Sequence, residues 1–187
     1  MTDRLARALA AVDEANAQDP DRSEGAPAAL LYGQRMSAEL ARLCPDASEP
    51  LQIAARGQHI ERWTSPRSGY PEGRAGYLAW RGDLARHHAA RVAQIMTGAG
   101  YSEAEAARAA KMLRKEGIKR DAEVQMLEDA ICFTFLRWYF APFAPTQEAA
   151  RLDRIVQKTA RKMSPGARAR ALAEFDLPDP VARHFRD

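Results

Sequence analysis

Apolar residues recur every three or four positions along most of the chain, and this spacing constrains its fold more than any other feature. Leu5, Leu9 and Val12 follow the pattern, as do Leu84 and Val92 much later in the chain. Such spacing places apolar side chains on one face of an α-helix, whereas a strand would alternate apolar and polar residues. No segment alternates in that way. We therefore expect an all-α, single-domain bundle of about seven to nine helices.

Proline, glycine and capping residues separate the expected helices. These helices cover residues 3–17, 27–43, 47–65, 73–97, 102–117, 121–141, 146–162 and 164–175, with a final turn or helix over 177–185. The segment 121–141 is the most apolar and is the predicted central helix. Ser102 and Glu105 have the spacing of a capping box, which marks a helix start.

Length, charge and cysteine content limit the number of domains, the partners and the cellular compartment that we expect for the protein. The chain has 187 residues, enough for one domain, and a net charge of only +3, which does not require a nucleic-acid partner. Cys44 and Cys132 lack the spacing of a zinc or redox motif and fit reduced thiols. No apolar run is long enough to span a bilayer, and the first residues lack a signal-peptide pattern. We expect a cytoplasmic protein that does not enter membranes, of open oligomeric state.

The stretch 56–88 concentrates residue types that carry chemistry. It holds His59, His87 and His88, together with tryptophans, tyrosines and repeated arginines. On a helix over 47–65, His59 would share a face with Arg56 and could bind a metal, move a proton or contact a phosphate. A histidine that hydrogen-bonds a carbonyl is the simpler alternative. On the next helix, we expect His88 to face inward beside Leu84 and His87 to face solvent.

Acidic residues outside this stretch are further candidates. Asp129 lies in the most apolar helix, where a carboxylate needs a partner, so it either pairs with an arginine or helps to bind a cation. Glu116 lies at a helix end and is either a catalytic group or a solvent-facing charge. A basic stripe near the carboxyl terminus is either a solvated face or an RNA contact: Arg154, Lys158, Arg161 and Lys162.

The order of these elements resembles the HD-domain phosphohydrolase superfamily, an all-helical fold, over a core of about residues 28–140, with carboxyl-terminal helices over 146–187. The segments that carry the resemblance are LLYGQRMSAELARL, ARGQHIERW and LEDAICFTFL. The resemblance places His59, His88, Glu116 and Asp129 at ligand positions. The chain departs from that family where Tyr32 or Gly33 replaces the first histidine and Ile60 replaces the aspartate of the His-Asp doublet.

A second resemblance extends over nearly the whole chain. The sequence is similar to the domain-of-unknown-function family numbered 4202 in several stretches: LLYGQRM, AARGQHIERW, PRSGYP, RAGYLAWR, HHA, LRKEG and LEDAICFTFL. This family implies no particular activity. Membership would imply that ten residues of the stretch 56–88 belong together: His59, Arg62, Trp63, Arg67, Tyr70, Arg74, Tyr77, Trp80, Arg81 and His88.

The leading functional hypothesis is a metal-dependent phosphohydrolase. His59, His88 and Asp129 would hold a divalent Mn, Mg, Fe or Zn ion, with His59 and Glu116 as catalytic groups. The substrate, a phosphorylated small molecule or nucleotide, would contact Arg56, Arg62, Trp63, Arg67, Tyr70, Arg74, Tyr77 and Arg81. Two alternatives stay open: a non-catalytic phosphate- or nucleotide-binding module, which the missing doublet aspartate favours, and a less favoured RNA- or protein-interaction domain.

Overall fold

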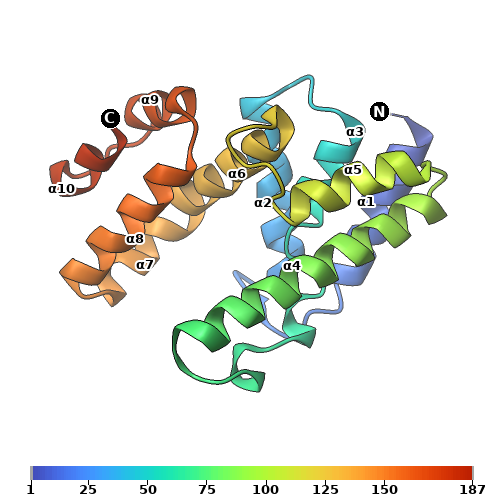
Figure 1. The fold of residues 1–187 in the computed structure, drawn as a ribbon, viewed down its shortest axis with the longest axis horizontal. Coiled ribbons are helices and arrows are strands. Elements are labelled where there is room, and N and C mark those ends of the chain that lie inside the picture. The colour runs from blue at the N-terminus through green and yellow to red at the C-terminus, as the bar shows by residue number, and fades with distance from the viewer. Residues whose placement is uncertain (1, 187) are drawn as a thin grey trace. The chain divides into compact units, whose positions relative to one another are not determined.

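The computed structural model describes residues 2–186, and helices dominate it (Figure 1). Within these residues the strands are limited to a short antiparallel hairpin, β1 Arg22–Ser23 with β2 Ala26–Pro27. The predicted all-α class is therefore confirmed. The chain forms two compact units, the first ending at Glu116 and the second beginning at Gly117. This boundary falls within the range 28–140 that the sequence suggested as a core.

The first unit is built from five longer helices. They are α1 Asp3–Asn16, α2 Ala28–Leu43, α3 Glu49–Arg56, α4 Gly73–Gly98 and α5 Glu103–Leu113, with the short 3₁₀ helices η1 Arg62–Thr64 and η2 Arg67–Gly69 between α3 and α4. The helices α4 and α5 lie side by side, and α3 packs against α1, α2 and α5 (Figure 1). The candidate residues of the stretch 56–88 thus lie at the end of α3, in the connection and on α4.

Capping explains where several of these helices begin. The side chain of Ser48 accepts a hydrogen bond from the Leu51 amide at the start of α3. Ser102 and Glu105 form the predicted capping box at the start of α5. Each cap satisfies amide groups that have no partner within the helix, and so fixes the first turn.

The end of α3 differs from the prediction, which continued this helix through His59 and Trp63. The helix ends at Arg56, and Gly57 caps it. A Cβ atom built on Gly57 would lie only 2.4 Å from Cγ2 of Val92 on α4, so the chain leaves α3 where its backbone touches α4. Glu61, with a φ of 51°, then turns the chain in the left-handed region. His59 therefore lies in a turn, and the predicted helical face shared with Arg56 was wrong.

The second unit starts with the predicted apolar helix. It comprises α6 Ala122–Thr134, the π-helical segment η3 Phe135–Tyr139, α7 Phe140–Phe143, η4 Ala144–Thr146, α8 Ala149–Lys162, α9 Pro165–Glu174, α10 Asp179–Ala182 and η5 Arg183–Phe185. Within this unit, α8 packs against α6, α10 and η5. The π-helical turn widens the helix after Thr134 without ending it.

Each unit has its own apolar core. In the first unit the largest fully buried apolar side chains are Met36, Leu40, Leu51, Ile53, Ile60, Met96 and Met112. In the second they include Leu127 and Phe133 of α6. Ile60 belongs to the turn after α3, so this turn is anchored in the core of the first unit although it is not helical.

We expect Gly57→Ala to lower the free energy of unfolding by about 1–3 kcal/mol, because the new methyl group would overpack the contact with Val92. Urea unfolding monitored by circular dichroism measures the change. The double variant Gly57→Ala with Val92→Ala should lose less stability than the sum of the two single variants.

Gly98→Ala is the matched control, because nothing lies within 4 Å of a Cβ atom built at Gly98 near the end of α4. We expect this variant to be as stable as the parent chain or slightly more stable. Equal stability of Gly57→Ala and Gly98→Ala would contradict the packing argument.

Candidate functional site

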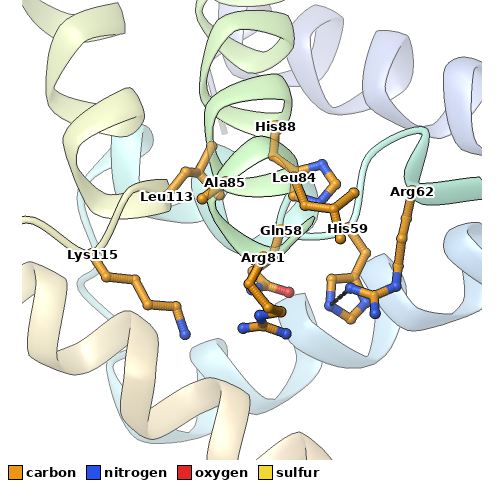
Figure 2. A pocket seen from close by; sticks show the side chains of 9 residues that line it. All are labelled: Gln58, His59, Arg62, Arg81, Leu84, Ala85, His88, Leu113 and Lys115. Atoms are coloured by element: carbon orange, nitrogen blue, oxygen red, sulfur yellow. Dashed lines mark hydrogen bonds between the residues drawn. The ribbon is translucent and has the colours of Figure 1, made fainter. Parts of the chain in front are cut away.

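A small pocket opens at the turn after α3, and its empty space, with the open solvent at its mouth included, is about 280 Å³. Four segments of the first unit line it: the turn 57–61, η1, α4 and the end of α5. The lining residues are Gln58, His59, Arg62, Arg81, Leu84, Ala85, His88, Leu113 and Lys115 (Figure 2). The predicted residues His59, Arg62, Arg81 and His88 are thereby brought together in one place.

His88 faces inward beside Leu84, as predicted, and its side chain is 5% exposed. Its Nδ1 lies 2.8 Å from the carbonyl oxygen of Ile60. Because a carbonyl oxygen only accepts hydrogen bonds, Nδ1 carries the proton, and Nε2 presents a lone pair. Nε2 is buried and has no hydrogen-bond partner. Burial, with a smaller contribution from neighbouring His87, Arg62 and Arg81, lowers the pKa of His88 to about 3.

His87 is directed away from this interior position. Its side chain is partly exposed, and its Nε2 lies 3.3 Å from Oε2 of Glu61. The sequence prediction that only one of the two adjacent histidines points inward is therefore confirmed.

The ring of His59 is held between an aromatic ring and a cation. Tyr32 of α2 stacks on it, with ring centres 3.9 Å apart and an interplanar angle of 18°. Nη1 of Arg62 lies 3.5 Å from Nε2 of His59, at the long limit of a hydrogen bond (Figure 2). Burial and then the charge of Arg62 hold the pKa of His59 well below its ordinary value. Both pocket histidines are therefore neutral near pH 7.

Gly33 explains how α2 brings Tyr32 to His59. A Cβ atom on Gly33 would lie 2.7 Å from the carbonyl oxygen of Arg56, so the absence of a side chain lets α2 approach the end of α3 closely. The helical glycine in LLYGQRM was the sequence signal for this contact. Sequence reasoning had identified Tyr32 and Gly33 only as positions where a histidine was missing.

Positive charge gathers at the pocket without acidic residues in its lining. Figure 2 shows the guanidinium group of Arg62 at the ring of His59, with the side chain of Arg81 on the other side of that ring in the view. The guanidinium carbon of Arg62 lies 4.8 Å from the ring centre of Trp80, a cation–π geometry. Burial, followed by the nearby charge of Arg81, lowers the pKa of Arg62. Within residues 2–186, Arg81 makes no hydrogen bond or ion pair.

The loop between η1 and α4 is tied to α4 by side-chain hydrogen bonds. Trp80 donates to the carbonyl of Ser65 at 2.9 Å, and the hydroxyl of Tyr70 donates to Asp83 at 2.8 Å. Arg67 donates to the carbonyls of Tyr70 and Pro71, both at 2.9 Å. The predicted binding residues Arg67 and Tyr70 thus hold the loop together and do not line the pocket.

The remaining predicted side chains of the first unit lie outside the pocket lining. Arg56 forms a two-pronged ion pair with Asp13, at 2.8 and 3.0 Å. Glu116 is about half exposed and pairs with Arg114 at 2.6 Å, which lowers the pKa of this carboxyl group. Trp63 is half-buried, whereas Arg74 and Tyr77 are exposed. Tyr77 is nevertheless close to the site, because its ring centre lies 5.9 Å from that of Trp80.

Asp129 belongs to the second unit and is 3% exposed. Its carboxylate accepts hydrogen bonds from the amide and the hydroxyl of Ser164, at 2.8 and 2.7 Å, and from Gln125 at 2.9 Å. Ser164 caps α9, so Asp129 fixes the start of that helix. Burial raises the pKa of Asp129 although these hydrogen bonds oppose the shift.

The donors do not fit the divalent metal that the HD resemblance implies. In the described part of the chain, no group of three His, Cys, Asp or Glu side chains is placed to hold a metal ion. The pocket supplies two imidazoles, and its cationic side chains would repel a metal cation. Ile60, which the HD resemblance aligns with the doublet aspartate, is fully buried in the core. The metal assignment for His59, His88 and Asp129 stays a prediction.

Four lining residues were not predicted from the sequence: Gln58, Ala85, Leu113 and Lys115. Ala85 could have been found, because it follows Arg81 by four positions on α4 and therefore shares its face. Leu113 is the last residue of α5 and Lys115 follows this helix, and no local pattern connects them to the stretch 56–88.

Comparison with known protein families gives a match that covers nearly the whole chain. The family described as Domain of unknown function (DUF4202) matches residues 6–183, so the chain belongs to this family. No curated protein and no solved structure matches it. The resemblance to the HD-domain superfamily therefore stays a prediction. No helix among residues 2–186 is both long and apolar enough to cross a membrane.

We expect acid to destabilise the first unit through His88. An ordinary histidine takes up a proton near pH 6.5, whereas folding lowers the pKa of His88 to about 3. Between these values the unfolded chain binds more protons than the folded chain, so stability is lost as the pH falls below 6.5. The free energy of unfolding should fall by about 1.4 kcal/mol per pH unit for this group. Urea titrations at pH 7, 6 and 5 measure the slope.

His88→Leu should reduce this pH slope, although it also lowers stability at every pH by leaving the carbonyl of Ile60 without its donor. His87→Gln should retain the slope, because it leaves the buried ring of His88 and its hydrogen bond to Ile60 in place. An unchanged slope in His88→Leu would contradict a neutral, buried imidazole at this position.

Proposed function

We propose that the first unit binds a phosphorylated small molecule, in particular a nucleotide, in the pocket around His59 and His88. The observation that carries this proposal is the pair Arg62 and Arg81, which both line a pocket with no acidic lining residue and are close enough for the charge of Arg81 to act on Arg62. Bringing two cations together in a partly buried place costs free energy. A bound anion would offset this cost by pairing with both.

The chemistry of the side chains favours phosphate among anions. A guanidinium group donates two parallel hydrogen bonds that match the oxygens of a phosphate or carboxylate. Lys115 adds a further cationic group to the pocket lining. The pocket is small, so it suits a phosphoryl group more than a whole nucleotide.

An exposed aromatic side chain near the pocket could stack on the base of a nucleotide. Tyr77 is 47% exposed and lies one helical turn before Arg81 on α4. Nucleobases stack on such rings, and this stacking tolerates any base. A phosphate held by Arg81 would place the base within reach of Tyr77. The proposal therefore retains for Tyr77 the substrate-binding role that the sequence suggested.

A metal-dependent phosphohydrolase would use the same pocket for its substrate. That activity requires a divalent cation, which would supply an activated water and polarise a phosphoryl oxygen. The lining of the pocket contributes no carboxylate for such an ion. Binding without metal is therefore the function that the geometry supports best, and hydrolysis is an outcome that the experiment can detect.

We expect AMP, ADP or inorganic phosphate to raise the melting temperature of the protein in the presence of EDTA. Ligand binding to the folded state alone stabilises it by about 2.7 kcal/mol when the ligand concentration is 100 times Kd. Arg81→Gln should weaken binding at least tenfold, since a hydrogen bond to a charged group contributes about 1.5–3 kcal/mol. Thermal shift and isothermal titration calorimetry provide the measurements.

Arg86→Gln is the matched control on the same helix. Arg86 is 69% exposed, pairs with Asp83 at the surface and does not line the pocket, so its loss should leave the affinity unchanged. Equal weakening by both substitutions would indicate a general charge effect and contradict the pocket. Stabilisation or phosphate release that appears only with Mn²⁺ or Mg²⁺ would favour the hydrolase instead.

A further inference from the structure

We propose that His88 makes this pocket selective for an oxyanion that keeps an acidic proton, such as phosphate or a phosphate monoester, over a fully deprotonated one such as sulfate. This inference rests on the anion binding proposed above and adds a rule for which anion is accepted. It follows from the two kinds of group in the pocket lining. The arginines donate hydrogen bonds, whereas one buried nitrogen can only accept a hydrogen bond and has no donor.

The acceptor is Nε2 of His88. Its partner nitrogen Nδ1 must donate to the carbonyl of Ile60 at 2.8 Å, and this fixes the tautomer of the neutral ring. Nε2 is then a bare lone pair, buried and without a hydrogen bond. A buried acceptor left without a donor costs free energy, about 1–3 kcal/mol, which a suitable ligand hydroxyl would remove.

The surroundings keep this ring neutral. The charged and titratable groups near it come from several elements: His59 and Glu61 from the turn after α3, Arg62 from η1, Arg81 and His87 from α4, and Lys115 after α5. Arg62, Arg81 and His87 all oppose a positive charge on the imidazole, and Glu61 pairs with His87 and Arg91. In a complex with an anion, the proton between Nε2 of His88 and the anion would therefore be carried by the anion.

Gln58 is the second buried polar group without a partner in the lining. Its side chain is 7% exposed, and its Oε1 makes no hydrogen bond. An amide can present its oxygen or, after rotation, its nitrogen, so Gln58 fits either a hydroxyl or a bare oxygen of the ligand. The selectivity therefore depends on His88, whose acceptor position is fixed by Ile60.

A protonated phosphate offers the hydrogen-bond donor and the acceptors that the pocket lining requires. A phosphate monoester has a second pKa of about 6, so a substantial fraction keeps one P–OH group near neutral pH. That hydroxyl can donate to Nε2 of His88 while the charged oxygens accept from Arg62 and Arg81. Sulfate has no proton under these conditions, and one of its oxygens would face the lone pair of Nε2. A site that offers unpaired polar groups rejects a ligand that lacks the complementary group.

Calorimetric titration of the unmodified chain with inorganic phosphate and with sulfate, at equal ionic strength, tests the inference. At pH 6 we expect phosphate to bind at least tenfold more tightly than sulfate. Inorganic phosphate keeps a P–OH group throughout this pH range, so the pH dependence is measured with a phosphate monoester such as AMP. Its affinity should decline as the pH rises from 6 to 8 and the monoester loses its last P–OH proton, whereas the weak affinity for sulfate should not follow that titration. Equal affinities for the two anions would overturn the selectivity alone, and binding of neither anion would overturn the pocket function as well.

A pair of variants tests the role of the ring. His88→Gln should bring the ratio of phosphate to sulfate affinity close to one, because an amide can donate to a bare oxygen. His87→Gln, on the same helix and outside the pocket lining, should leave the ratio unchanged. A ratio that is unchanged in His88→Gln would contradict the proposal. If that variant does not fold, the pH dependence of the unmodified chain decides the question.

Discussion

The hydrogen bond from Nδ1 of His88 to the carbonyl of Ile60 joins the turn after α3 to the middle of α4. It satisfies a backbone carbonyl that would otherwise be buried without a partner, because Ile60 itself is fully buried. The close contact between Gly57 and Val92 makes this approach possible. One interaction thus fixes the backbone of the turn, the tautomer of a histidine and the direction in which its second nitrogen is available.

The arginines at the pocket differ from two others in the first unit in whether a carboxylate pairs with them. Arg56 is neutralised by Asp13, and Arg91 by Glu61. Arg62 and Arg81, by contrast, lie near one another at a pocket lined by no acidic residue, and the pKa of Arg62 is lowered. A fold that pairs Arg56 and Arg91 with carboxylates but leaves Arg62 and Arg81 together concentrates positive potential at one place. Such a concentration is typical of a site that receives an anion.

Local periodicity made most of the helices predictable, whereas contacts between distant segments limited the prediction of the site. The pattern on α4 placed Arg81, Leu84 and His88 on one face correctly, because their spacing follows the helical repeat. The end of α3 was missed because Ile60 continues the apolar spacing beyond Gly57. The partners of Asp129 were also missed, since Ser164 lies 35 positions further along the chain. The stacking of Tyr32 on His59 depends similarly on the approach of α2 that Gly33 permits.

The resemblance to HD hydrolases would place an aspartate at position 60, where this chain has Ile60. In a hydrolase with a His-Asp doublet, an acidic side chain at this position would bring negative charge to the histidines. Here the Ile60 side chain is buried in the core, and only its backbone carbonyl meets His88. The positive charges of Arg62 and Arg81 are then left unbalanced, which favours an anion over a cation. In the proposed function, charge would account for the attraction of any anion, while the fixed lone pair of His88 would distinguish one anion from another.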